Sequence, residues 1–194
     1  MIDPDAMVMT LPGINAAAQS LGVEPAVVRA VAEVESRGSG FLPDGRPVIL
    51  FEGHQFSKRT GGVYDPTYPT ISYPRWTKAH YLGGAREYER FDIASHLNEL
   101  AAMQSTSWGA FQIMGFNSAA CGFDSVRQFV EAMRESADRH LLAFVEFVKS
   151  NGLAGHLRRM AWADFARAYN GAGYAANRYD EKLAAAYAKH AASA

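Results

Sequence analysis

Residues 25–40, PAVVRAVAEVESRGSG, contain the helix that decides the fold and end on the glycines that stop it. Pro25 suits the first turn of a helix, where its missing N–H would have no partner in any case. An apolar stripe at helical spacing follows, formed by Val27, Val28, Val31 and Val34. We therefore predict a helix from Pro25 to Ser36 that buries its valine face and ends before Gly38.

Two carboxyl groups lie near the end of this helix. Glu33 follows Arg29 by four residues, so an ion pair on the solvated face is expected. Glu35 lies in the last turn, where the negative end of the helix dipole disfavours a carboxylate. A carboxyl group that keeps its proton at neutral pH is what a general acid needs. Glu35 is therefore a candidate general acid, and a surface residue at a frayed helix end is the alternative.

Helical patterns recur along the chain and predict a mostly helical protein. They cover residues 14–21, 86–103, 126–133, 137–150, 162–169 and 175–192. PVILFE, residues 47–52, is a short apolar run bounded by turn residues, which is typical of a strand. Residues 61–85 have no sustained period, and we predict a long ordered loop of the kind that is often functional. The predicted class is α+β, predominantly α.

Length and composition restrict the class of protein. The 194 residues fit a single domain over 1–194, with residues 1–12 predicted as a flexible N-terminal tail. A net charge of −1 argues against nucleic-acid binding, and the single cysteine excludes an intramolecular disulfide. No apolar run approaches the roughly 18 residues of a membrane span, so membrane insertion is not expected. The first residues carry Asp3 and Asp5 without a basic region, which is unlike a signal peptide.

Two further segments carry candidate polar groups. In QSTSWGAFQIMGFN, residues 104–117, Ser107 and its two predecessors are predicted to cap a short helical turn. Gln112 lies in an apolar run there and needs a partner or a ligand. The segment lacks the G-x-S-x-G pattern of a serine hydrolase, and a buried turn is the alternative. In residues 165–187, Tyr169 is either a sugar-stacking or a core aromatic, and Asn170 can both donate and accept.

Other chemistries have little support in the sequence. The six histidines form no H-E-x-x-H pattern, so no metal and no cofactor is expected. Cys121 lies among small and apolar residues, where a structural buried thiol is the default over a nucleophile.

Four strings in order carry a resemblance that none carries alone. They are ESRGSGF (35–41), ILFEGH (49–54), SWGAFQIMGFN (107–117) and YNGAGYAANRY (169–179). The chain resembles the lysozyme-like superfamily, which includes goose-type lysozymes and lytic transglycosylases. It is most similar to the N-acetylmuramidase family found in phage endolysins, over residues 14–190. Two departures from the family pattern are Gly53, where a larger and often basic residue is common, and Ala172, where a proline is expected.

The resemblance implies a lysozyme-like fold with a small β region beside a catalytic cleft. It implies cleavage of the β-1,4 bond between N-acetylmuramic acid and N-acetylglucosamine in the glycan strands of peptidoglycan, by a monomer. Glu35 corresponds to the catalytic glutamate that protonates the departing glycosidic oxygen. Ser107 and Gln112 would bind the acetamido sugar or position the water. Tyr169 and Asn170 would line the cleft, with Tyr169 hydrogen-bonded to Glu35.

The second carboxylate is open at this stage. Glu52 is the candidate, because it follows a short strand that can face the acid across a cleft, with Asp44 and Asp65 as runners-up. The alternative for Glu52 is a salt bridge to a nearby Arg46, Lys58 or Arg59. Lytic transglycosylases use no second carboxylate, because a hydroxyl of the substrate attacks.

The expected setting is a bacterial cytoplasm for synthesis and the periplasm or cell wall for action. A phage endolysin released at lysis and an antibacterial effector secreted into rival bacteria both fit a chain without a signal peptide. Family members often carry a separate wall-binding module, and no such domain is expected in these 194 residues. A non-catalytic wall-binding protein of the same fold is the alternative of a different class.

Overall fold

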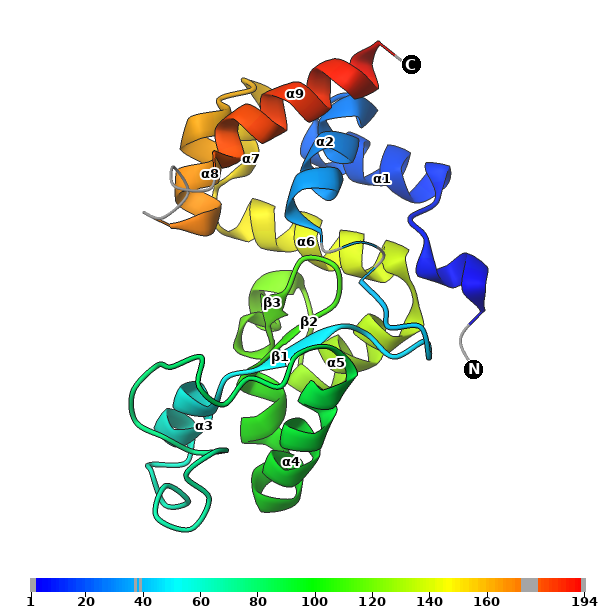
Figure 1. The fold of residues 1–194 in the computed structure, drawn as a ribbon. Coiled ribbons are helices and arrows are strands. Elements are labelled where there is room, and N and C mark those ends of the chain that lie inside the picture. Colours follow the sequence, from blue (N-terminus) through cyan, green and yellow to red (C-terminus); the bar gives the residue numbers. More distant parts are fainter. Residues whose placement is uncertain (1–2, 37, 39, 172–177, 193–194) are drawn as a thin grey trace.

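A computed structural model describes residues 3–36, 38, 40–171 and 178–192, and helices dominate it. Helix α6 crosses the middle of the described structure, with one group of helices on one side and the sheet with a second group of helices on the other (Figure 1). The first group consists of α1 (Leu11–Leu21), α2 (Pro25–Glu35), α7 (Ala154–Arg158), α8 (Trp162–Asn170) and α9 (Tyr179–Ala191), and α6 spans Ala137–Ser150. The second consists of α3 (Gly53–Arg59), α4 (Glu87–Gln104), α5 (Val126–Glu135) and the strands β1 (Ile49–Phe51), β2 (Thr106–Trp108) and β3 (Ile113–Met114). The α+β class with a small β region is confirmed.

The sheet is antiparallel with the order β1-β2-β3. Ile49 lies opposite Trp108, and Ser107 lies between Leu50 and Met114. The helical turn predicted after Ser107 was therefore wrong, because these residues form strand β2. Two neighbouring strands pair with β2, and Gly109, at φ 70°, turns the chain back toward β3. That pairing is tertiary information, which overrides the local capping preference of the hydroxyl side chains.

Helix boundaries follow the caps. Helix α2 begins at Pro25 and ends at Glu35, and α6 begins behind Ser136, whose side chain accepts the N–H of Arg139. Helix α1 begins three residues earlier than predicted. Its cap, Thr10, donates its hydroxyl to Asp138 at 2.6 Å, so part of the N-terminal segment expected as a tail is tied to α6.

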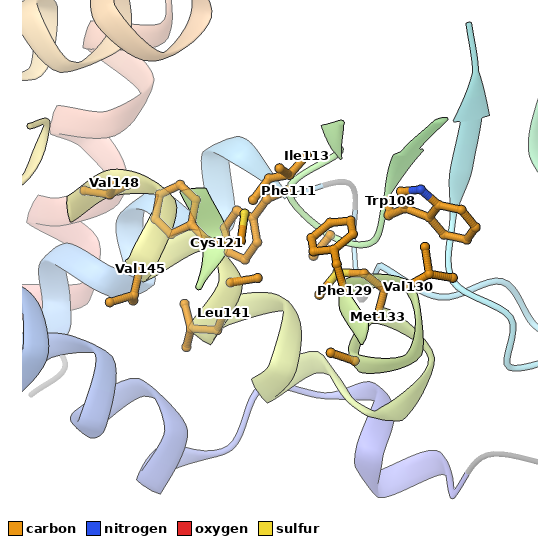
Figure 2. Close-up of a cluster of buried hydrophobic side chains, with 14 of the residues drawn as sticks. Trp108, Phe111, Ile113, Cys121, Phe129, Val130, Met133, Leu141, Val145 and Val148 are labelled. Atoms are coloured by element: carbon orange, nitrogen blue, oxygen red, sulfur yellow. The ribbon is translucent and has the colours of Figure 1, made fainter. Parts of the chain in front are cut away.

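The core is centred on α5, α6 and the β hairpin. Figure 2 shows its buried side chains, with Trp108 beside α5 and Phe111 beside α6. The Phe111 ring stacks on Phe144 at a centroid separation of 4.3 Å, and Trp108 meets Phe91 edge-on at 5.2 Å. This packing fixes the hairpin that carries Gln112 to the centre of the molecule.

The long loop between α3 and α4 is held by a buried ion pair. Glu87 accepts the backbone N–H groups of Leu82 and Gly83, while Arg90 donates to the carbonyls of Phe51 and Thr70. Among the described residues, four other short elements are single turns of 3-10 helix, at Pro4–Met7 (η1), Gly84–Arg86 (η2), Gly115–Asn117 (η3) and Ala119–Cys121 (η4).

The structure explains why glycine occupies position 53, one of the two departures from the family pattern. A Cβ atom on it would lie 2.3 Å from a ring carbon of Tyr73 and 2.5 Å from the Ile71 carbonyl oxygen. The loop therefore packs directly on the start of α3, and a larger side chain at this position would displace it. The other departure, Ala172, lies outside the described residues.

Candidate active site

Glu35 is the last residue of α2 and lines a cavity of about 380 Å³, which is within the usual range of ligand pockets. The hairpin, the turn after β3, α6 and the last two helices supply the remaining walls. These walls are mostly apolar or aromatic, and among the described residues they consist of Phe111, Gln112, Ile113, Met114, Asn117, Phe147, Tyr169 and Tyr179. A carboxyl group thus lines a cleft that combines aromatic walls with several polar groups, and proton-transfer groups of enzymes are found in clefts.

Tyr169 lines this cavity together with Glu35. Its ring lies parallel to that of Phe165 at 5.6 Å, and its hydroxyl donates to the Phe111 carbonyl oxygen at 3.4 Å. Burial raises the pKa of Tyr169 above its usual value, and the negative charge of Glu35 adds to that rise. Tyr169 therefore stays protonated, and its single hydroxyl proton is directed to the Phe111 carbonyl oxygen.

Ser107 and Gln112 bond to each other and to the backbone. The Ser107 hydroxyl donates to Gln112 Oε1 at 3.0 Å, and Gln112 Nε2 donates to the carbonyls of Val48 and Gly109 at 3.1 and 2.8 Å. The partner that the sequence required for Gln112 is thus supplied by the protein. Gln112 has φ 49°, an uncommon backbone conformation that the three hydrogen bonds of its side chain maintain.

Glu52 lies at the start of α3 and is not among the described residues that line the cavity of Glu35. Both of its carboxylate oxygens accept the Tyr81 hydroxyl, at 2.8 and 2.7 Å, and one lies 3.2 Å from His54 Nδ1. The Glu52 side chain is 14% exposed. The burial of Tyr81 and its bond to this carboxylate raise the Tyr81 pKa, so the tyrosine remains a donor.

The other predicted partners and runners-up are engaged elsewhere. Arg46 forms an ion pair with Asp44 at 2.7 Å, and Arg59 donates to the Gln55 side chain at 2.7 Å. The alternative in which Glu52 pairs with one of these arginines is therefore not seen. Glu52 contacts Tyr81 and His54 instead. Asp65 accepts the hydroxyls of Ser57 and Ser72 inside the loop. Both runner-up carboxylates thus have local structural partners.

Two polar residues of the site were missed by sequence reasoning. Asn117 lines the cavity of Glu35, and Tyr81 binds Glu52 across 29 residues of sequence. Asn117 belongs to the string SWGAFQIMGFN, whose last residue was a usable signal. Asn170, which was predicted to line the cleft, is the last residue of α8, and its side chain lies outside the described part of the structure.

The surroundings of Cys121 and of the potential metal-ligating residues bear on the alternative chemistries. Cys121 is buried, and burial raises its thiol pKa to about 12, which keeps it a poor nucleophile. Among the described residues, no group of three or more His, Cys, Asp or Glu side chains is arranged to hold a metal ion. In that same part of the chain, no helix has the length and hydrophobicity to cross a membrane.

Comparisons with known proteins agree with this geometry. The sequence pattern of the N-acetylmuramidase family matches residues 24–191. The fold matches the crystal structure of the Burkholderia AP3 phage endolysin with a TM-score of 0.90 and 43% sequence identity, over 98% of this chain and 73% of that one. No curated protein is significantly similar in sequence. With its glutamate at the end of α2 facing the cavity, this chain belongs to the N-acetylmuramidase family of glycoside hydrolases, whose substrate is peptidoglycan.

Proposed function

We propose that the protein cleaves the β-1,4 bond between N-acetylmuramic acid and N-acetylglucosamine, with Glu35 as the general acid. The observation that carries the proposal is the position of Glu35 in the wall of the cavity, among apolar and aromatic side chains. Glu35 gives its proton to the glycosidic oxygen as the bond from that oxygen to the anomeric carbon breaks. The sugar ring, left with oxocarbenium character, is then attacked by water.

We propose Glu52 as the second carboxylate, which takes a proton from the attacking water. Tyr81 supports this role because its hydroxyl is hydrogen-bonded to the carboxylate and holds it in one orientation. Its position outside the lining of the Glu35 cavity favours the alternative, in which Glu52 only anchors the loop through Tyr81. In that case a hydroxyl of the substrate attacks, as in lytic transglycosylases, and the product carries an anhydro end.

Two matched substitutions and one product analysis test the proposal. Glu35→Gln should lower kcat by about 10²–10⁴-fold without loss of folding, because general acid catalysis contributes a factor of this size. Glu52→Gln should lower kcat by about a hundredfold or more if Glu52 is the base. Glu131→Gln, a change at an exposed carboxyl group of α5, is the control and should keep full activity.

Mass spectrometry of digested peptidoglycan identifies the reaction. Reducing muramic acid ends support hydrolysis at the proposed bond, and anhydro ends indicate transglycosylation. Reducing glucosamine ends would refute the bond specificity. Full lysis by Glu35→Gln would sink the catalytic proposal and favour a wall-binding protein.

We further propose that the protein acts as a phage endolysin, made in the bacterial cytoplasm and active on the cell wall after release. The similarity to the AP3 endolysin over 98% of this chain supports this role. An effector secreted into rival bacteria is the alternative. A neighbouring holin gene favours the endolysin, whereas neighbouring immunity and secretion genes favour the effector.

A further inference from the structure

The polar side chains in the wall of the Glu35 cavity differ in how many of their donors and acceptors are already hydrogen-bonded within the protein. Both N–H groups of the Gln112 amide are engaged with backbone carbonyls, and the Tyr169 hydroxyl donates to Phe111. Asn117 lines the same cavity, yet in the described part of the chain its side-chain amide makes no hydrogen bond. Of these three polar side chains, Asn117 is therefore the one whose donor and acceptor are both available to a bound molecule.

The fold places Asn117 at the cavity by a close backbone contact. Asn117 ends the 3-10 turn Gly115–Asn117 (η3), which follows β3 directly. A Cβ atom on Gly115 would lie 2.1 Å from the Met103 carbonyl oxygen, so only glycine lets this turn rest on the end of α4. The neighbouring Phe116 is 42% exposed and lies under the Arg59 guanidinium at 4.6 Å, away from the core. The turn that carries Asn117 is thus held by contacts with α4 and with Arg59.

The chemistry of the cavity wall indicates what Asn117 would bind. A carboxamide offers one acceptor oxygen and two N–H donors. Ile113 and Met114 lie beside it in the wall and supply apolar contact. A 2-acetamido group on a sugar has the complementary parts, namely one N–H donor, one carbonyl acceptor and one methyl group. A charged group would leave the donor or the acceptor of the carboxamide unmatched, and a hydroxyl would offer no methyl group to the apolar side chains.

We propose that Asn117 recognises the 2-acetamido group of the sugar bound beside Glu35 and so makes the enzyme specific for N-acetylated glycan. Its Oδ1 accepts the acetamido N–H, its Nδ2 donates to the acetamido carbonyl, and the methyl group lies against the apolar wall. This inference rests on the proposed glycan cleavage at Glu35. It assigns Asn117 a role in substrate specificity that Gln112 is less able to take, because the N–H groups of that amide already bind the hairpin.

The test compares two soluble glycan-strand substrates that differ only in acetylation. One is peptidoglycan glycan strand with its acetamido groups intact, and the other is the same material after N-deacetylation. The wild-type enzyme should prefer the acetylated strands by about ten- to a hundredfold in kcat/KM, since two hydrogen bonds are lost with the acetyl group. Strands that are deacetylated and then re-acetylated must recover the full rate, which controls for chain damage.

The decisive variant is Asn117→Leu, which keeps the branched shape and the number of non-hydrogen side-chain atoms but neither donates nor accepts a hydrogen bond. It should raise KM on acetylated strands by about tenfold or more and change kcat by less than about threefold. The preference for acetylated strands should shrink to within about twofold. Asn15→Ala, an exposed asparagine on α1, is the control and should keep the wild-type preference.

Binding separates recognition from folding defects. In the Glu35→Gln background, Asn117→Leu should weaken the Kd for acetylated strands by about tenfold and leave the Kd for deacetylated strands unchanged. An equal loss on both substrates, or a fall in kcat with the preference intact, would overturn the proposal in favour of a water-positioning or structural role. If the wild-type enzyme releases no reducing muramic acid ends from acetylated strands, the proposed function itself fails, whatever Asn117 does.

Discussion

At the scale of single residues, His140 shows how a buried polar side chain shapes the site from a distance. Its Nδ1 accepts the backbone N–H of Ala110 at 3.1 Å, and its Nε2 donates to the Met133 carbonyl at 2.7 Å. Cβ atoms on Gly40 and Gly109 would fall within 3 Å of this ring. The imidazole therefore fixes the turn of the hairpin that carries Gln112, and it must be neutral to accept the Ala110 hydrogen bond.

The His140 titration predicts a specific loss of stability in acid. Desolvation lowers the pKa of His140 to about 4, so between pH 6.5 and 4 the unfolded chain binds a proton that the folded chain does not. The free energy of unfolding should therefore fall as the pH falls, by about 2 kcal/mol between pH 7 and pH 5. Urea unfolding curves of wild type and His140→Gln at both pH values measure this.

The variant should be less stable at pH 7 and should lose this part of the pH dependence. His96→Gln, a change at an exposed histidine, should keep it. An unchanged pH dependence in His140→Gln would show that other groups cause the acid loss.

At the scale of elements, the first turn of α4 organises the long loop beside Glu52. Glu87 and Arg90 form an ion pair at 3.1 Å and are 0% and 3% exposed. Through Arg90, this turn binds the carbonyl of Phe51, and through Glu87 it binds the backbone that follows Tyr81. The pair thus joins β1 to the loop and holds Tyr81 close to Glu52.

Breaking this pair should be costly. Arg90→Met leaves the Glu87 carboxylate buried without its cation, which we expect to lower the free energy of unfolding by about 3–5 kcal/mol. The loop should also become sensitive to limited proteolysis between α3 and α4. Arg86→Met, which removes an exposed ion pair with Glu89, is the control and should cost less than about 1 kcal/mol. Equal stability of the two variants would contradict the role given to the buried pair.

At the scale of the whole molecule, the last helix holds the helix that ends in Glu35. Helix α9 packs along α2, and Lys189 and His190 bind Glu33 at 2.9 and 2.8 Å. Leu183 of α9 is 0% exposed and belongs to the core. The Glu35 cavity therefore depends on contacts between the two ends of the chain.

Leu183→Ala should lower the free energy of unfolding by about 2–5 kcal/mol, because it opens a void in this core. The matched control is Leu142→Ala, since Leu142 is 43% exposed on α6 and should cost less than about 1 kcal/mol. Thermal or urea unfolding measures both changes. A Leu183→Ala variant as stable as Leu142→Ala would contradict the packing of α9 on α2.

The helices, strands and loops differ in how well the sequence alone predicted them. Helices α2 and α6 were predicted with nearly correct ends, because Pro25 favours the start of a helix and both segments have apolar residues at helical spacing. The strand at β1 and the loop after α3 were also predicted. The hairpin of β2 and β3 was missed, because serine and threonine hydroxyls cap helices and also fit strands, and only pairing with β1 decides between them.

The sequence by itself determined the family, the helical fold and Glu35 as the candidate acid, because ordered motifs and helical periodicity are local properties of the chain. Only the tertiary structure decided which polar groups remain available at the site. Ser107 and Gln112 bind each other, Tyr81 binds Glu52, and Asn117 faces the Glu35 cavity. Hydrogen bonds depend on distance and direction in space, and residues far apart in sequence meet these conditions only after the core has packed.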